Sequence, residues 1–222
     1  MRNTEPHFDE DQYLQEQYGE DLELKSDEKL KVKGKAYANR KLEHKRPAND
    51  FYETPYCMTE ELVKTGALKN VKTVWDPCCG KYAILNVLKK YGFSTFGNDI
   101  MYGFDYFQQQ YQKHECIVMN PPFKLFDAFV TKAKEEADLV CAIGKANYFG
   151  SHSRNVNGLW EHLKEVYFFD RQIAFDKPLR ADNKVECGMM ITGWFVWDMT
   201  YSGKPEINVI DMQQYILRKG EK

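Results

Sequence analysis

Apolar residues are distributed unevenly along the 222-residue chain, and the pattern changes near residue 50. Before Asp50 the apolar residues are scattered among charges and do not reach the density of a core element. From Asp50 onward, short apolar runs typical of buried strands alternate with amphipathic stretches typical of helices. The pattern predicts a charged N-terminal arm, residues 1–49, and one folded domain, residues 50–222.

The folded part is predicted to alternate between strands and helices. The expected strands are Val71–Asp76, Ser94–Asp99, His114–Met119 and Asp138–Lys145. The expected helices are Ala83–Tyr91 with Gly92 as its stop signal, Lys124–Ala137 and Gly158–Val166. This alternation predicts an α/β fold with a mainly parallel central sheet and helices on both faces.

Further β-prone segments lie in the C-terminal third of the chain. Tyr167–Phe169 reads as a buried strand, Gly188–Trp197 is strongly β-prone, and Ile207–Ile210 is a short strand candidate. We expect the last two to form an antiparallel edge hairpin on the parallel core.

The arm changes the sign of its charge along its length. Residues 1–28 are acidic and polar, whereas residues 29–46 are rich in Lys and Arg and contain Glu43 as their single acid. Such a segment is predicted to be mobile or partly helical. Its basic half is suited to bind phosphates, but the two halves are equally suited to neutralise each other as a solvated tail.

Composition limits the class of protein. The chain is 43% hydrophobic, its net charge is −2, and its mean hydropathy is −0.64, as expected of a globular protein. It contains no apolar run near the roughly 20 residues needed to cross a bilayer, and its N-terminus lacks the layout of a signal peptide. The six cysteines include no C-x-x-C pair, which argues against a structural zinc site and fits a reducing compartment. We therefore expect a cytoplasmic protein with no metal and no membrane partner.

The most informative residues are Asn120, Pro121, Pro122 and Phe123, which follow the predicted strand 114–119. Ligands of open α/β sheets bind at the carboxyl ends of strands, and two consecutive prolines fix the backbone there. The Asn120 amide and the Pro121 carbonyl offer two acceptors for the hydrogens of an aromatic amine. Phe123 offers a flat face for stacking a base swung out of a duplex.

Two other strand ends support a site at this edge. Asp76, Pro77, Cys78 and Gly80 follow the first strand, where a glycine lets a cofactor approach the backbone and the next helix start is electropositive. Asp99 ends the second strand, as a residue that binds a ribose diol should. Asp105 lies in the loop beyond, where it is able to accept from an adenine amine.

With these residues in this order, the chain resembles the amino-methyltransferase branch of the S-adenosylmethionine-dependent methyltransferases, especially the small adenine-specific DNA methyltransferases of phages and prophages. The similarity covers roughly residues 50–198. It includes an opening segment with Phe51, Thr54 and Pro55, and weaker likenesses at Asn147–Ser151 and Trp194–Trp197. The order of the glycine motif and the Asn-Pro-Pro-Phe turn is specific to the branch.

The resemblance implies a class I methyltransferase fold, S-adenosylmethionine as cofactor and double-stranded DNA as substrate in a bacterial cell. It implies methyl transfer to the 6-amino group of a flipped-out adenine, with Asn120–Phe123 catalytic. The cofactor-binding residues that it implies are Phe51, Thr54, Pro55, Asp76, Pro77, Cys78, Gly80, Asp99, Ile100, Asp105, Tyr106 and Asn120. The sequence does not choose between monomer and dimer.

The chain departs from the family pattern at two places. Tyr82 stands where the cofactor loop normally has a second glycine, and residues 150–184 leave little room for a separate target-recognition domain. Cations in that segment, such as Arg171 and Lys177, are suited to contact phosphates. We therefore expect short or relaxed sequence specificity, or reliance on the basic arm.

Two alternatives to the DNA enzyme follow from the same residues. RNA adenines and the side-chain amide of protein glutamine also present a planar NH₂ group to an Asn-Pro-Pro turn. The second alternative is a degenerate protein that has the methyltransferase fold and binds without catalysing a reaction. Tyr82 supports this alternative. A nicotinamide-dependent dehydrogenase is disfavoured, since residues 80–82 do not supply the fuller G-x-G-x-x-G loop.

Overall fold

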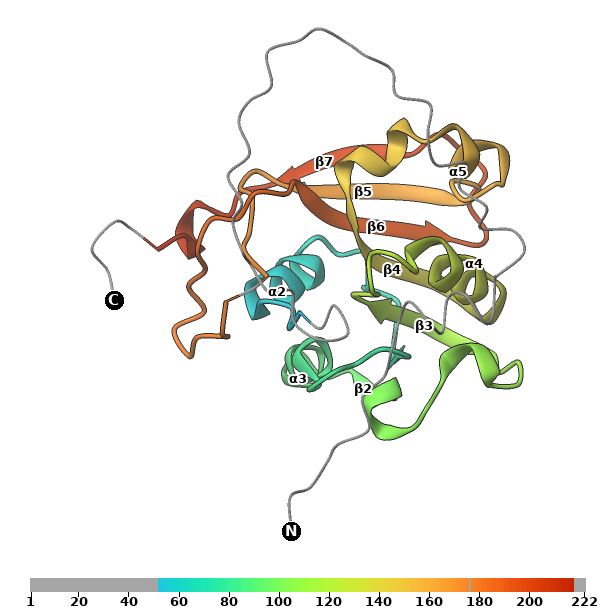
Figure 1. The fold of residues 1–222 in the computed structure, drawn as a ribbon, viewed down its shortest axis with the longest axis horizontal. Helices are drawn as coiled ribbons and strands as arrows, with labels where there is room; N and C mark the ends of the chain where they lie inside the picture. The colour runs from blue at the N-terminus through green and yellow to red at the C-terminus, as the bar shows by residue number, and fades with distance from the viewer. Residues whose placement is uncertain (1–51, 176, 218–222) are drawn as a thin grey trace, which may run out of the picture. The chain divides into compact units, whose positions relative to one another are not determined.

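The computed structural model describes residues 52–175 and 177–217 (Figure 1). The predicted arm, residues 1–49, and Phe51 lie outside the described residues, so the domain boundary near residue 50 stays a prediction. The helices are α2 (Tyr56–Lys64), α3 (Ala83–Lys90), α4 (Phe126–Glu136) and α5 (His152–Val156). Short 3₁₀ turns occupy η2 (Ile100–Tyr102), η3 (Tyr106–Gln108), η4 (Ala146–Gly150) and η5 (Gln213–Tyr215).

Seven strands form one sheet in the order β2-β1-β3-β4-β6-β5-β7 (Figure 1). They are β1 (Thr73–Asp76), β2 (Ser94–Gly97), β3 (His114–Met119), β4 (Ala137–Lys145), β5 (Leu163–Phe169), β6 (Thr192–Asp198) and β7 (Glu206–Ile210). Strands β2, β1, β3 and β4 are mutually parallel. Strand β6 is antiparallel to both of its neighbours, β4 and β5. The predicted α/β class, a mainly parallel sheet with antiparallel pairing to one side, is confirmed.

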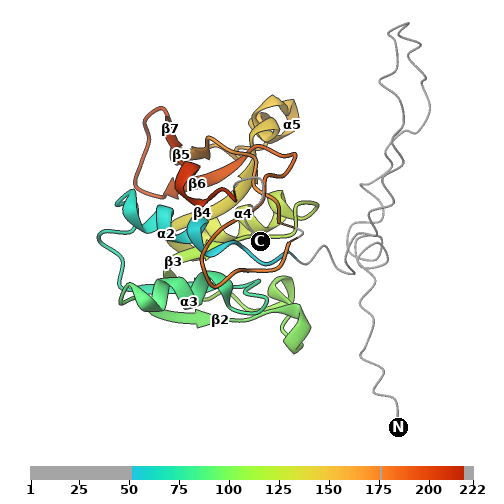
Figure 2. The ribbon, with the colours of Figure 1, turned by 90° about the vertical axis from the view of Figure 1, so that its left-hand side faces the viewer.

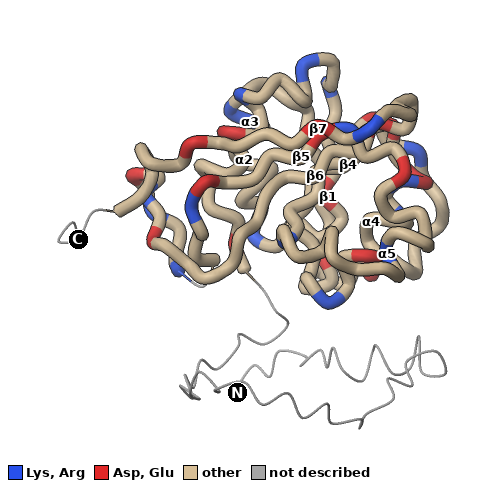
Figure 3. The backbone as a smooth tube through the Cα atoms, turned by 90° about the horizontal axis from the view of Figure 1, so that it is seen from above, with Lys and Arg blue, Asp and Glu red and all other residues tan. Residues whose placement is uncertain are grey.

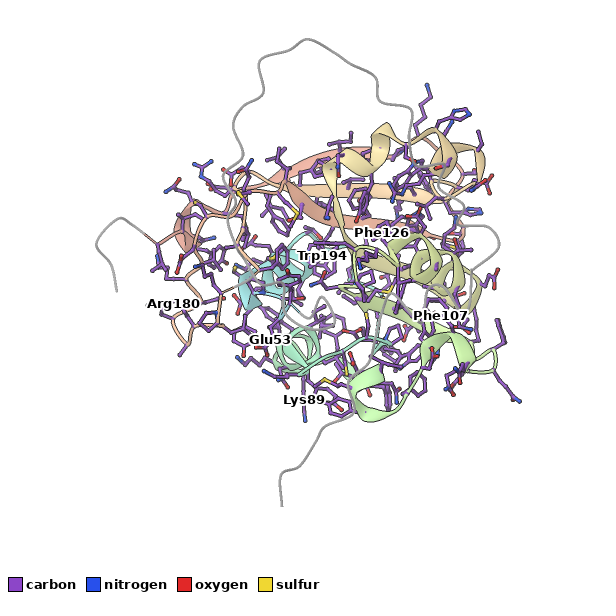
Figure 4. The ribbon with its side chains drawn as sticks, in the orientation of Figure 1. Glu53, Lys89, Phe107, Phe126, Arg180 and Trp194 are labelled. Atoms are coloured by element: carbon purple, nitrogen blue, oxygen red, sulfur yellow. The ribbon has the colours of Figure 1, made fainter. Side chains whose placement is uncertain are left out.

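Helices cover both faces of the sheet (Figure 2), and buried side chains fill the space between the sheet and the helices on each face. Along β6, Trp194 and Phe195 point to opposite faces, as strand geometry requires. The Trp194 indole donates a hydrogen bond to the Met58 carbonyl of α2 at 2.8 Å, whereas Phe195 contacts the Phe126 ring of α4. Trp194 and Phe126 are labelled in Figure 4. Leu88 of α3 belongs to the same buried cluster as Met58. Thus α2 and α3 cover one face, and α4 covers the other.

The strand ends of the parallel half agree with the sequence prediction to within two residues. Strands β1, β3 and β4 are short apolar runs bounded by turn residues, whereas Phe96 is the one large apolar residue of β2 and is exposed. Strand β3 has the predicted bounds, and helices α3 and α4 lie within the predicted ranges Ala83–Tyr91 and Lys124–Ala137. None of the helices among the described residues combines the length and apolar character that a membrane span requires.

The predicted helix at Gly158–Val166 is wrong. Its apolar residues Leu159, Leu163 and Val166 are spaced three to four apart and all are buried, which mimics a helical face. In the structure, Gly158 takes a left-handed φ of 71°, and strand β5 begins at Leu163. Pairing with β6 on one side and β7 on the other decides this segment, and neither partner is near it in sequence.

The C-terminal strands are arranged differently from a simple hairpin. Strand β6 lies inside the sheet between β4 and β5, and all of its residues from Thr192 to Trp197 are buried. Strand β7 forms the edge and pairs in parallel with β5 rather than with β6. The part of the apolar run Gly188–Trp197 that forms β6, residues 192–197, therefore reflects burial on both faces, whereas residues 189–191 before it are exposed.

Gly97 is a position where the packing leaves no space for a side chain. A Cβ there would lie 2.9 Å from the Cys79 Cβ and would also meet the Leu85 side chain. We expect Gly97→Ala to lower the free energy of unfolding by about 1–3 kcal/mol, the usual cost of overpacking. Urea unfolding measures this.

Gly150→Ala is the matched control, because no heavy atom lies within 4 Å of the Cβ that it would add. Its unfolding free energy should stay within about 0.5 kcal/mol of the wild type. Equal unfolding midpoints for the two variants would contradict the packing argument.

Candidate active site

Four polar residues gather at one edge of the sheet, because adjacent parallel strands end there. Asp76 is the last residue of β1, and Asp99 follows β2 closely. Asn120 follows β3 directly, and Lys145 is the last residue of β4. The strand register places these ends side by side. This is the edge at which open α/β sheets bind ligands.

The loop after β1 is tied to the end of β2 by Asp99. One carboxylate oxygen of Asp99 accepts a hydrogen bond from the Gly80 N–H at 2.8 Å, and the other accepts one from the Met101 N–H at 2.9 Å. The Cys79 N–H donates to the Asn98 carbonyl at 2.9 Å. Asp99 is 7% exposed. The predicted glycine motif and the predicted ribose acid therefore meet as one unit.

Asp76 lies buried beside this unit, with 1% of its surface exposed. Burial raises the pKa of its carboxyl to about 7, and the negative charge of nearby Asp99 adds to the rise. The Cys78 N–H donates to Asp76 Oδ1 at 3.0 Å, which opposes the rise in pKa. Two carboxyls thus share a low-dielectric corner, and a cation placed near them would relieve their repulsion.

Tyr82 takes a left-handed φ of 65° immediately before α3. Glycine adopts this conformation freely, whereas an L side chain pays roughly 1–2 kcal/mol for it. The Tyr82 ring stacks on the Tyr102 ring with centroids 5.8 Å apart. The Tyr102 hydroxyl in turn donates to the Gly80 carbonyl at 3.1 Å. The loop therefore keeps the backbone geometry of a glycine at position 82 and places the tyrosine ring against a neighbouring aromatic.

Asn120 connects the Asn-Pro-Pro-Phe turn with the opening segment. Its Nδ2 donates to the Thr54 hydroxyl at 3.0 Å and makes a longer contact, 3.4 Å, with the Tyr52 carbonyl. This orients the amide so that its Oδ1 lies on the side away from Thr54. Pro55 precedes α2 as its N-cap residue. Two segments that the sequence marked separately are thus in direct contact.

Phe123 is surrounded by residues that the sequence analysis did not assign to the site. The Lys145 ammonium lies 4.3 Å from the centroid of the Phe123 ring, and the Phe175 ring meets that ring edge to face at 6.2 Å. The Tyr148 hydroxyl donates to the Phe123 carbonyl at 3.1 Å. Lys145 could have been assigned to the site from the sequence, because it ends a predicted parallel strand. No local sequence pattern indicates that Phe175 belongs to the site.

The remaining predicted residues have varied surroundings. Asp105 caps η3 by accepting from the Phe107 N–H at 2.9 Å, and Ile100 is 40% exposed next to Asp99. Tyr106 is 3% exposed, packs edge to face on Trp75, and donates its hydroxyl hydrogen to Glu136 at 2.8 Å. These contacts give Tyr106 a place in the core.

Comparison with known proteins bears on the fold. No protein-family model matches the sequence, and no curated protein matches it. A Listeria monocytogenes protein, provisionally described as a class I S-adenosylmethionine-dependent methyltransferase, has a TM-score of 0.50 and 8% identity; the match covers 72% of this chain and 65% of that one.

Two subunits from restriction-modification systems also match. One is the methyltransferase subunit of a type I system from Streptococcus thermophilus, with a TM-score of 0.49, 12% identity, and coverage of 77% of this chain and 49% of that one. The other is a modification subunit from Vibrio vulnificus, provisionally described as part of a type I restriction enzyme, with a TM-score of 0.48, 12% identity, and coverage of 73% and 47%. The chain spans about half the length of these two proteins.

The likeness to the Listeria protein, together with the strand order, shows a Rossmann-like methyltransferase fold. At 8% identity, the likeness to the Listeria protein shows the fold alone. The two subunits, whose TM-scores are below 0.5, add no support to this assignment. The predicted cofactor, S-adenosylmethionine, is consistent with this fold.

The raised pKa of Asp76 makes stability depend on pH in a definite direction. An unfolded aspartate has a pKa near 4, so the folded state binds the Asp76 proton more tightly than the unfolded state does. The resulting stabilisation is fully present below about pH 4 and is lost as pH rises through about 7. Relative to Asp76→Asn, the wild type should therefore lose unfolding free energy between about pH 5 and pH 8, measured by urea unfolding.

Glu206→Gln, which removes an exposed carboxyl on β7, controls for the loss of one negative charge. A constant stability difference between wild type and Asp76→Asn across this pH range would refute the assignment.

Proposed function

We propose that the protein transfers a methyl group from S-adenosylmethionine to the exocyclic 6-amino group of an adenine in double-stranded DNA. The observation that carries the proposal is the position of Asn120. It is held by Thr54 at the end of β3, at the same sheet edge as the loop that Asp99 ties down. This juxtaposes an amine-binding turn with a cofactor-type loop.

The residues present fit S-adenosylmethionine. When bound, it supplies an electrophilic methyl group on a sulfonium. Asp76 and Asp99, both buried at the end of β1 and β2, offer negative charge to a cationic cofactor. Asp99 keeps lone pairs for ribose hydroxyls beyond the two hydrogen bonds that it accepts, and exposed Ile100 offers an apolar surface for an adenine ring.

The turn Asn120–Phe123 has the features needed to hold the substrate amine. The Asn120 Oδ1 and the Pro121 carbonyl are the acceptors for the two amine hydrogens, which directs the nitrogen lone pair toward the cofactor side. Phe123 provides the stacking face for the extruded base. The contribution of these residues is mainly positioning, which by itself removes a large part of the barrier to a two-substrate reaction.

The choice of DNA rests on the resemblance of the segments around Asp50–Pro55 and Asn147–Ser151 to phage adenine methyltransferases. RNA adenine and a glutamine side-chain amide remain the competing substrates for the same turn. The non-catalytic alternative rests on Tyr82, whose ring lies against Tyr102.

Cofactor binding is the first test. Asp99→Asn preserves the size of the side chain but removes the negative charge, so it should weaken S-adenosylmethionine binding by about 10–100-fold in isothermal titration calorimetry. Glu206→Gln, which removes an exposed carboxyl on the edge strand β7, separates the role of Asp99 from a general loss of charge. Absence of binding by the wild type, with recovery in Tyr82→Gly, would support the non-catalytic alternative.

Methyl transfer is the second test. Asn120→Ala should lower kcat on DNA by about 10²-fold or more, because the amine loses an acceptor that aligns it. The assay follows labelled methyl groups from S-adenosylmethionine into duplex DNA, RNA and a glutamine peptide.

Asn86→Ala, an exposed position on α3, is the control and should retain full activity. Transfer to RNA or peptide but not to DNA would correct the substrate, and unchanged turnover by Asn120→Ala would remove the turn from the mechanism.

A further inference from the structure

Three consecutive apolar side chains are exposed close to the candidate site. Met189, Met190 and Ile191, which we call the apolar ridge, expose 80%, 38% and 50% of their surfaces. They directly precede β6, whose first residues pair with the carboxyl end of β4. Contiguous exposed apolar residues at a site mark a surface that is covered by something else when the protein works.

The backbone of the apolar ridge is fixed at both ends. The Ala146 N–H donates to the Ile191 carbonyl at 3.0 Å, and the Gly188 N–H donates to the Gln172 carbonyl at 2.6 Å. A Cβ at Gly188 would lie 2.6 Å from the Ile173 carbonyl oxygen, so the chain passes close to its neighbour there. The exposed side chains therefore lie on a segment whose backbone is fixed by hydrogen bonds at both ends.

Each end of the apolar ridge is paired with a segment that contributes a side chain next to Phe123. At one end, Thr192 pairs with Lys145, whose ammonium lies 4.3 Å from the centroid of the Phe123 ring. At the other end, Cys187 forms a β-bridge with Ile173, which is two residues before Phe175, and the Phe175 ring contacts the Phe123 ring. The ridge therefore runs between the two groups that touch the proposed base-stacking face.

We propose that the apolar ridge is a wedge that enters the base stack of duplex DNA and fills the space left by the extruded adenine. The inference rests on the proposed function, because it takes Phe123 as the acceptor of that base. Extrusion costs unstacking and unpairing free energy, and apolar side chains inserted between bases offset such a cost. Methionine is flexible and polarisable, which suits an irregular gap.

The surroundings favour a base stack over a protein partner. Three side chains cannot supply the roughly 800 Å² that a stable protein interface needs from each partner, whereas a single opened base step needs only one or two apolar side chains to fill it. Lys177 already pairs at 3.6 Å with Glu186, the residue next to the bridge-forming Cys187. Lys and Arg are interspersed with Asp and Glu along the described backbone (Figure 3), so apolar contact is the distinctive feature at this place.

The test compares two duplexes built on an adenine that the wild-type protein methylates, mapped beforehand by sequencing treated DNA. One duplex is fully paired, and the other has an abasic site opposite the target, where the pairing is already lost. We expect Met189→Ser/Met190→Ser to lower kcat/KM on the paired duplex by at least about 10-fold, and on the abasic duplex by less than about 3-fold. Met189→Leu/Met190→Leu should retain most of the activity on both.

Ile207→Ser/Val209→Ser is the matched control, because these β7 residues are 63% and 68% exposed at the far edge of the sheet. It should act like the wild type on both duplexes. Unchanged cofactor binding by the methionine variant shows that it folds. Equal losses on the two duplexes, or no loss, overturn the wedge while leaving the proposed function intact. Inactivity of the wild type on any DNA overturns the proposed function, and the wedge with it.

Discussion

The carboxylate of Asp99 is the element on which the candidate site depends. It accepts from the Gly80 and Met101 N–H groups at once, so a single side chain closes the loop after β1 against the loop after β2. A carboxylate that accepts backbone hydrogen bonds in a buried place makes charge-assisted bonds stronger than neutral ones. The proposed cofactor loop thus has its shape before any ligand arrives, which would reduce the ordering cost of binding.

The same carboxylate sets the electrostatics of the site. Asp76 is buried next to Asp99, and its pKa rises because both burial and the neighbouring charge disfavour its ionised form. Two adjacent buried carboxyls destabilise the ligand-free protein, whereas a bound cation would be attracted to both. The repulsion between the two carboxyls destabilises the free protein, and so does the left-handed backbone at Tyr82. Strain of this kind is concentrated at functional sites.

The proposed substrate contacts come from a different part of the sheet. Asn120 depends on Thr54, whereas Phe123 depends on the end of β4 and on the β5–β6 connection, through Lys145 and Phe175. The cofactor-type loop belongs to β1 and β2. Since β1, β3 and β4 are hydrogen-bonded neighbours, the sheet holds the two halves in fixed relation, and chemistry that relies on positioning requires this.

The sequence by itself determined the elements whose signals are local. Strands β1, β3 and β4 are short apolar runs bounded by turn residues, and the turn at Asn120 is fixed by two prolines, so β3 and the candidate edge of the sheet could be predicted. Tertiary structure decided the rest. The segment Gly158–Val166 carries a helical spacing but is drawn into β5 by strands distant in sequence. Likewise, Phe175 reaches Phe123 only because the sheet brings them together, and no local pattern encodes a contact between segments 52 residues apart (175 − 123).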